Sequence, residues 1–186
     1  GLLLRHTTNQ NNEICNIGIS EHLIVLTKDA DPEVRRKSTA ALGEYLFYGA
    51  TQLDGSEQSK RWEIKDAQVQ ALSLVISSSK DQVAVMYALK TIENITCQSE
   101  LGGIKFCQVQ LLELLIRLYK DEKTHVNARK SMIVSIVNIC FMRKEFVYDV
   151  VEQLELKTIV AGIAESVERI QQALLTLLNL YIYCCG

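Results

Sequence analysis

The residue types that most often perform catalysis or hold metals are sparse and widely spaced in this chain. They are His6, His22, His125, Cys15, Cys97, Cys107, Cys140, Cys184 and Cys185. Zinc sites need such ligands at short fixed spacings, and the sequence has no C-x-x-C pair and no H-E-x-x-H. It also has no glycine-rich phosphate loop and no G-x-S-x-G turn. We therefore predict no catalytic, metal-binding or cofactor-binding residue here, and free thiols typical of a reducing compartment.

Asparagines that recur at long intervals indicate a different chemistry, the binding of a peptide. Asn94, Asn138 and Asn179 each follow a small residue, an aliphatic residue and a variable one, and Glu44 takes the same place in an earlier copy. Successive copies are 50, 44 and 41 residues apart. An asparagine side chain carries two donors and an acceptor, so it can pair with the backbone of a bound peptide. Hydrogen bonds on a helix surface or between repeats fit the same spacing, and both interpretations stay open.

One face of the helices that carry this pattern is the candidate partner-binding groove. In the second copy, four aliphatic residues at helical spacing should point to the core: Val85, Leu89, Ile92 and Ile95. Asn94 lies about 200° around the helix from Ile92, so it should face away from that core. The predicted groove residues share the register of the asparagines: Glu44, Tyr48, Tyr87, Lys90, Asn94, Gln98, Ser131, Asn138, Met142, Gln172, Asn179 and Tyr183.

Pairs of helices must position these side chains. Four segments share an apolar helix, a short polar turn and a second helix, at about 14–51, 62–98, 104–142 and 146–185. Residues 52–61 are predicted to be a loop insertion, and residues 146–163 a single helix. This period is typical of HEAT and armadillo units. One pair cannot bury its apolar face alone, so stacked pairs must supply the core.

Turn residues mark where the second helices begin. The run Asp31-Pro32-Glu33 combines an N-cap, a proline at the first helical position and a carboxylate in the first turn. Asp81, Thr124 and Ser166 can cap the other second helices in the same way.

Composition agrees with this architecture. The 186 residues are 48% apolar, with one proline and nine glycines, which argues against turn-rich sandwiches and barrels. No apolar run is long enough to span a bilayer, so no membrane association is predicted. We predict an all-α fold: one domain over 1–186, forming a right-handed α-solenoid of about four armadillo/HEAT-like repeats. The chain lacks an initiator methionine, so we expect it to be a fragment of a larger protein.

Two stretches carry a family resemblance. Asp31–Gln52 and Met86–Ile95, with Trp62 after the insertion, resemble the armadillo/HEAT repeat region of Fused-like and Unc-51-like serine/threonine kinases, in their RUNKEL-type pseudokinase branch. The resemblance implies a C-terminal, non-enzymatic scaffold with a protein or peptide partner, in the cytoplasm and linked to microtubule-based structures such as cilia. Any ATP would belong to a kinase or pseudokinase domain of the parent protein, because this sequence has no V-A-I-K, H-R-D or D-F-G motif.

Two other functions compete with a general scaffold. A peptide carrier of the nuclear-import-adaptor type would share the asparagine ladder, but such adaptors place a tryptophan four residues before each asparagine. This sequence has Lys90, Val134 and Leu175 at those positions, which argues against import-signal binding. A helical-repeat nucleic-acid binder would need a basic stripe, whereas the net charge is −2 and the groove mixes both signs.

The last helix predicts one further contact. Residues 174–183 are very apolar, and an exposed apolar patch of this kind drives association. We therefore expect the partners to include a second copy of the chain, bound through this C-terminal end.

Overall fold

The computed structural model describes residues 17–52, 62–165 and 167–185, and every regular element in these ranges is a helix. The chain divides between Lys105 and Phe106 into two compact units. Unit 1 comprises the residues up to Lys105 and unit 2 those from Phe106 onward, and each is described by itself. The single domain over 1–186 therefore stays a prediction. The predicted loop insertion at 52–61 lies, apart from Gln52, outside the described residues.

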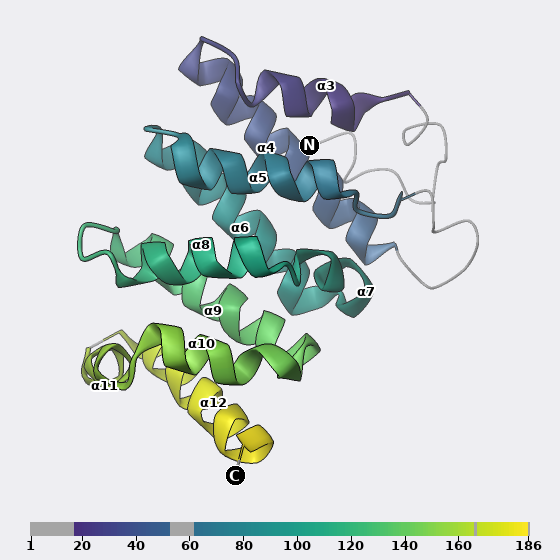
Figure 1. Cartoon of the computed structure of the whole chain (residues 1–186). Helices are drawn as coiled ribbons and strands as arrows, with labels where there is room; N and C mark the ends of the chain where they lie inside the picture. The colour runs from purple at the N-terminus through teal and green to yellow at the C-terminus, as the bar shows by residue number, and fades with distance from the viewer. Residues whose placement is uncertain (1–16, 53–61, 166, 186) are drawn as a thin grey trace. The chain divides into compact units, whose positions relative to one another are not determined.

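Unit 1 consists of two helix pairs and a short terminal turn. Its elements are α3 (Ile19–Leu26), α4 (Pro32–Thr51), α5 (Asp66–Ser78), α6 (Gln82–Gln98), α7 (Glu100–Gly103) and the first residues of the 3-10 turn Ile104–Phe106. The first helices of the pairs, α3 and α5, lie side by side in one layer, and the second helices, α4 and α6, form the other (Figure 1). Unit 1 is thus a stack of two pairs in register.

Side-chain caps start the second helices of unit 1 where the sequence predicts them. Asp31 accepts a hydrogen bond from the backbone N–H of Glu33 at 2.8 Å, and Pro32 takes the first helical position. Asp81 likewise accepts from the backbone N–H of Val83 at 3.0 Å. These bonds satisfy donors that have no partner within the helix, so both predicted caps are confirmed.

The core of unit 1 lies between its two layers. The four side chains predicted to point inward from α6 are all buried: Val85, Leu89, Ile92 and Ile95. Leu42 and Leu46 of α4 and Leu72 of α5 are also buried, each at most 2% exposed, and α6 packs on both of these helices. Burial of each such side chain contributes about 1.5–3 kcal/mol, so this apolar stripe holds the two pairs together.

Unit 2 repeats the two-layer plan with one extra helix. Its elements are α8 (Val109–Lys120), α9 (Val126–Met142), the 3-10 turn Lys144–Phe146, α10 (Val147–Leu154), α11 (Leu156–Ala164) and α12 (Glu168–Cys185). Here α8 and α10 lie in one layer and α9 and α12 in the other, with α11 against α10 and α12 (Figure 1). The predicted second helices therefore again pack on each other.

Two local predictions for unit 2 are wrong. The single helix expected over 146–163 is broken at Glu155, whose φ of 64° lies in the left-handed region and turns the chain between α10 and α11. His125, not Thr124, caps α9: its ring nitrogen accepts from the backbone N–H of Asn127 at 3.2 Å. The Thr124 hydroxyl instead donates to the carbonyl of Leu118. The predicted cap Ser166 lies outside the described residues.

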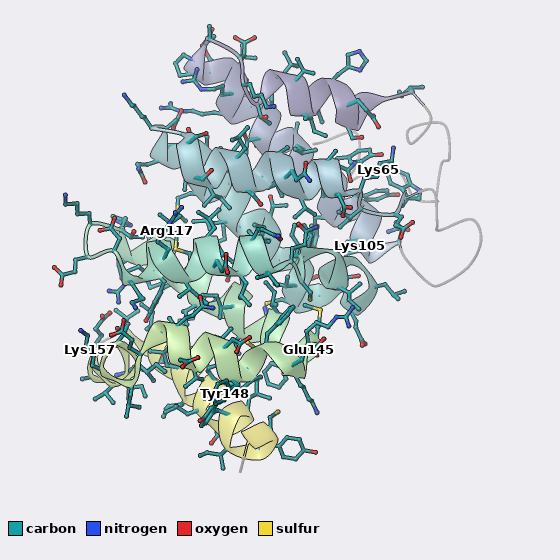
Figure 2. The ribbon with its side chains drawn as sticks, viewed as in Figure 1. Lys65, Lys105, Arg117, Glu145, Tyr148 and Lys157 are labelled. Atoms are coloured by element: carbon teal, nitrogen blue, oxygen red, sulfur yellow. The ribbon has the colours of Figure 1, made fainter. Side chains whose placement is uncertain are left out.

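Surface ion pairs and ring stacks join neighbouring segments within each unit. Lys105 pairs with Glu63 in unit 1, and the ring of Tyr148 on α10 stacks on that of Tyr181 on α12, with centroids 6.3 Å apart (Figure 2). Within the described ranges, none of the helices has both the length and the apolar character needed to cross a membrane.

Candidate functional site

A cleft of about 480 Å³ lies in unit 1 between the second helices α4 and α6. Five of the predicted groove residues line it together: Glu44, Tyr48, Tyr87, Lys90 and Asn94. The cleft therefore brings together side chains that the sequence separates by up to 50 residues, from two successive repeats.

Small residues set the floor of the cleft by letting the two helices approach closely. A Cβ atom on Gly43 of α4 would lie 2.2 Å from the Oγ1 atom of Thr91 on α6, a distance at which atoms overlap. Thr91 is held in place because its hydroxyl donates to the carbonyl of Tyr87 at 2.8 Å. Ala40 adds a third small side chain to the lining. A larger residue at position 43 would force the helices apart and change the cleft.

Three aromatic residues line the cleft: Phe47, Tyr48 and Tyr87. Tyr48 packs edge-on against Trp62 with ring centroids 5.4 Å apart, and Tyr45 packs against the same indole in a tilted arrangement at 5.6 Å. Trp62 is only 3% exposed, so it acts as a fixed support for Tyr48. Tyr87 is 43% exposed, and with Phe47 it completes the aromatic lining. Rings with a polar tip suit a surface that binds a partner.

Lys90 supplies a positive charge to the cleft, and it pairs with a carboxylate that the sequence analysis missed. Glu93 is 2% exposed, and the Lys90 ammonium lies 2.5 Å from its Oε2 atom. The three-residue spacing between Lys90 and Glu93, which places both on one helix face, is the signal that indicates the pair. The pair fixes the Lys90 side chain beside Tyr87 and Asn94 along the same helix.

Other residues missed by the sequence analysis are the small and apolar ones that shape the cleft. They are Ala40, Gly43, Phe47, Thr51 and Thr91. Thr91 occupies the small-residue position that recurs three residues before each asparagine. That recurrence was the sequence signal that a neighbouring helix packs closely at this position. Gln98, a predicted groove residue at the end of α6, is exposed but does not line the cleft.

In unit 2 one predicted groove residue is wrong and the others are distributed over two helices. Ser131 is fully buried at 0% exposure, so it cannot contact a partner at the surface. Its helix α9 packs against both α8 and α12, which cover most of its sides. Asn138 and Met142 on α9 are half-buried. Gln172, Asn179 and Tyr183 are exposed along one face of α12.

The reactive side chains of the described residues do not gather into a metal-binding group. Over 17–52, 62–165 and 167–185, no three His, Cys, Asp or Glu side chains are arranged to hold a metal ion. Burial raises the pKa of the Cys140 thiol to about 12 and that of Cys107 to about 11. Cys97 and Cys184 are exposed. The cleft is equipped for binding, through aromatic, amide and charged groups on fixed helices.

Solved structures with the same arrangement of helices define the fold class. Two engineered proteins match with TM-scores of 0.51 and 0.52, each at 13% identity, over 89% and 88% of this chain and 84% and 47% of their own. A designed armadillo repeat protein also matches, with a TM-score of 0.49 at 17% identity. The two engineered proteins and the stacked helix pairs within each unit confirm the predicted class, an all-α solenoid of helical repeats.

Curated relatives confirm the predicted family resemblance. The chain is similar to the serine/threonine-protein kinase RUNKEL of Arabidopsis thaliana, with 31% identity over 192 residues that include 97% of the chain. It is also similar to the serine/threonine-protein kinase ULK4 of Mus musculus, with 22% identity over 193 residues and 99% of the chain. In both cases the chain spans only 14% of the relative's length. No family model matches the sequence.

Proposed function

We propose that this chain is a non-catalytic protein-interaction scaffold that binds an extended segment of a partner protein in the α4–α6 cleft. The observation that carries the proposal is the convergence of Tyr48, Tyr87, Lys90 and Asn94 on one cleft. In this proposal the aromatic rings pack against apolar side chains of the partner. The Asn94 side chain pairs with the partner's backbone, since it offers both donor and acceptor groups.

The dimensions of the cleft support a peptide rather than a small cofactor as its occupant. The cleft runs between two helices of 20 and 17 residues, and its lining covers positions 40 to 51 on one and 87 to 94 on the other. Three turns of helix on the first side give room for several residues of an extended chain, each of which advances by about 3.3 Å. The lining includes both Glu44 and Lys90, so charged groups of either sign on the partner segment can be attracted to the cleft.

The similarity to two kinases supports a role as the repeat region of a larger kinase or pseudokinase. Any ATP would then be bound by a kinase domain outside these residues. The cytoplasmic location and the link to microtubule-based structures rest on the resemblance of the sequence to Fused-like and Unc-51-like kinases. Co-sedimentation of the chain with stabilised microtubules tests direct attachment, and a chain that stays in the supernatant at all tubulin concentrations contradicts it.

The binding role is tested by selecting ligands for the cleft from a library of random peptides displayed on phage. Selected peptides are synthesised with a fluorescent label, and their affinity for the chain is measured by anisotropy. Truncation of a central aromatic side chain typically costs more than about 1–2 kcal/mol in an interface. We therefore expect Tyr87→Ala to weaken binding about tenfold or more, and Asn94→Ala to weaken it about fivefold.

A matched control distinguishes peptide binding in the cleft from nonspecific binding to exposed aromatic side chains. Tyr148 on α10 has the same side chain as Tyr87 and a similar exposure, 53% against 43%, but it is not part of the cleft (Figure 2). Tyr148→Ala should leave the affinity unchanged. Equal losses with both tyrosine variants, or no loss with Tyr87→Ala, would overturn the proposed site. Circular dichroism of each variant checks that the helices stay intact.

A further inference from the structure

A second cavity in unit 1 lies at the turns that join the helices of each pair. It has a volume of about 400 Å³ and is lined by Thr27, Lys28 and Asp29 from the first turn, Arg35 from α4, and Leu74, Val75, Ser78, Ser79 and Lys80 from the second pair. None of these residues lines the α4–α6 cleft, so the two sites are separate.

The stacking of repeats explains why lysines meet in this cavity. Lys28 is the second residue after the end of α3, and Lys80 is the second residue after the end of α5. Equivalent positions of successive repeats lie next to each other in a stack, and the two lysines therefore line the same cavity. In the third predicted repeat the residue two positions after the end of α8 is Glu122, so this pairing of lysines is a feature of the first two repeats.

The cations of this cavity carry no acidic partner. Among the described residues, neither Lys28 nor Lys80 forms an ion pair or a side-chain hydrogen bond. Arg35 donates from Nη1 to the carbonyls of Asp29 and Ala30, both at 2.7 Å, which fixes the guanidinium but leaves its charge without a carboxylate. Neighbouring lysines and arginines differ: Arg36 pairs with Asp81, and Lys37 pairs with Glu33.

The charge of the lining is therefore positive. Three cations face one carboxylate, Asp29, whose Oδ1 atom already accepts from the backbone N–H of Asp31 at 2.8 Å. Ser78 and Ser79 also line the cavity; the Ser78 hydroxyl donates to the carbonyl of Leu74, and that of Ser79 accepts from the backbone N–H of Asp81. A fixed guanidinium and ammonium groups that line one cavity suit a phosphoryl group, because the phosphoryl oxygens accept several charge-assisted hydrogen bonds at once.

We propose that this cavity binds a dianionic phosphoryl group, held by Arg35, Lys28 and Lys80. The group can be free phosphate or the phosphate of a phosphorylated serine on a partner protein. The recognition chemistry is the same for both sources, and the experiment distinguishes them. Binding here is independent of the α4–α6 cleft and gives the first two repeats a second, charge-based contact.

The proposal is tested by titrating the isotope-labelled 186-residue chain with inorganic phosphate, and separately with a short neutral peptide that carries one phosphoserine. The unphosphorylated twin of the peptide is the reference. We expect saturable shifts of the backbone amides around Lys28 and Lys80 in two-dimensional NMR spectra. The double variant Lys28→Gln/Lys80→Gln loses two charge-assisted contacts. Its apparent affinity for the phosphate probe that binds should therefore be weaker by about tenfold or more.

A charge-matched control distinguishes binding in the cavity from a general electrostatic effect of removing two positive charges. The double variant Lys37→Gln/Lys65→Gln removes the same total charge from unit 1, at two exposed lysines outside the cavity. It should keep the affinity of the natural chain. Saturable binding of inorganic phosphate alone identifies a free anion as the ligand, and tighter binding of the phosphopeptide than of its twin identifies a modified partner. Absence of saturable shifts with both probes, or equal weakening in both double variants, overturns the proposal.

Discussion

At the residue scale, the contact between Gly43 and Thr91 determines how closely α4 and α6 can pack. The 2.2 Å separation that a Cβ at position 43 would have from the Thr91 Oγ1 atom leaves no room for any side chain. After removal of that oxygen, the nearest remaining atom is the Thr91 Cβ at 3.4 Å, which is close to an ordinary contact. The steric conflict is therefore confined to one atom on each helix.

This conflict predicts a rescue in a double-mutant cycle. Gly43→Ala should lower the free energy of unfolding by about 1–3 kcal/mol, the usual cost of overpacking. In a Thr91→Ala background the same substitution should cost at least about 1 kcal/mol less, because the overlapping oxygen is gone. Urea denaturation of the four proteins measures the coupling. Strictly additive losses would mean that the two helices do not meet at this pair.

Burial separates the cysteines of the chain by reactivity. Cys140 is 0% exposed, and burial raises the pKa of its thiol to about 12, so almost no thiolate forms at neutral pH. Cys97 and Cys184 are exposed. We expect iodoacetamide to label these two in the native chain and to reach Cys140 only after unfolding. Peptide mass mapping checks this, and prompt labelling of Cys140 in the folded chain would contradict the packing of α9.

Individual residues also show where helical register fails as a predictor. The register of the asparagines placed Asn94 and Ser131 on the same groove, yet one is exposed and the other fully buried. Ser131 stands seven residues before Asn138, as Tyr87 stands before Asn94, and its helix α9 packs against both α8 and α12. Register gives a direction around the helix, but the packing of the neighbouring helices decides whether that direction reaches solvent.

At the element scale, Asp81 joins the start of α6 to the preceding second helix. Its carboxylate accepts from the backbone N–H groups of Val83 and Ala84 and lies 2.6 Å from the Nε atom of Arg36 on α4. Burial acts to raise the pKa of Asp81, but the hydrogen bonds from Arg36 and from the two N–H groups outweigh it and lower the pKa. One side chain thus caps a helix and connects two repeats.

The lowered pKa predicts how this contribution depends on pH. Because the pKa of Asp81 is lower in the folded chain than in the unfolded chain, where it is about 3.9, the unfolded state binds the proton more readily. The stabilisation is fully present above the unfolded value and is lost as the pH falls through the folded value. Asp81→Asn keeps a good cap without the charge, and should lower the free energy of unfolding by about 1 kcal/mol at pH 7. Denaturation curves should show this difference between the natural chain and the variant closing below about pH 4. A difference that stays constant with pH would contradict the ion pair.

The helices themselves were largely predictable from the sequence, because cap residues and apolar spacing mark most of them. Pro32 begins α4 and Asp81 precedes α6 as predicted. The break at Glu155 was not predictable, since neither glycine nor proline marks it and the apolar spacing continues on both sides. Glu155 pairs with Lys120 of α8 and lies 3.6 Å from Lys157, so contacts within unit 2 accompany the turn.

At the scale of the whole molecule, the last helix leaves apolar side chains in contact with solvent. Ile182 is 66% exposed, Tyr183 77% and Leu175 49%. We expect the chain to associate at high concentration in sedimentation experiments, and Ile182→Lys to weaken that association by disrupting this surface. Val25 of α3 is 69% exposed and is a matched control, so Val25→Lys should leave the association unchanged. A monomeric chain at all concentrations, or an equal effect of both variants, would contradict this interface.

The class of the fold and part of the candidate site were predictable because both follow from repetition. Copies of one helix pair give a period, and the period places Glu44 on one helix and Asn94 on the next along the same cleft. The second cavity was not predictable, because it depends on which turn residues lack partners. Lys28 and Lys80 look like ordinary surface lysines until the contacts of their neighbours are known.

The most direct test of the central claim, that the α4–α6 cleft binds an extended partner segment, is to map a library-selected peptide by NMR. The peptide is added to the isotope-labelled chain, and shifts are followed for backbone amides and for the Asn94 side-chain amide. We predict saturable shifts of the Asn94 side chain and of residues 43–51 and 87–94, at the same peptide concentrations that saturate anisotropy. Saturable shifts confined to α3, α5 or unit 2, with the cleft residues unchanged, would contradict the claim.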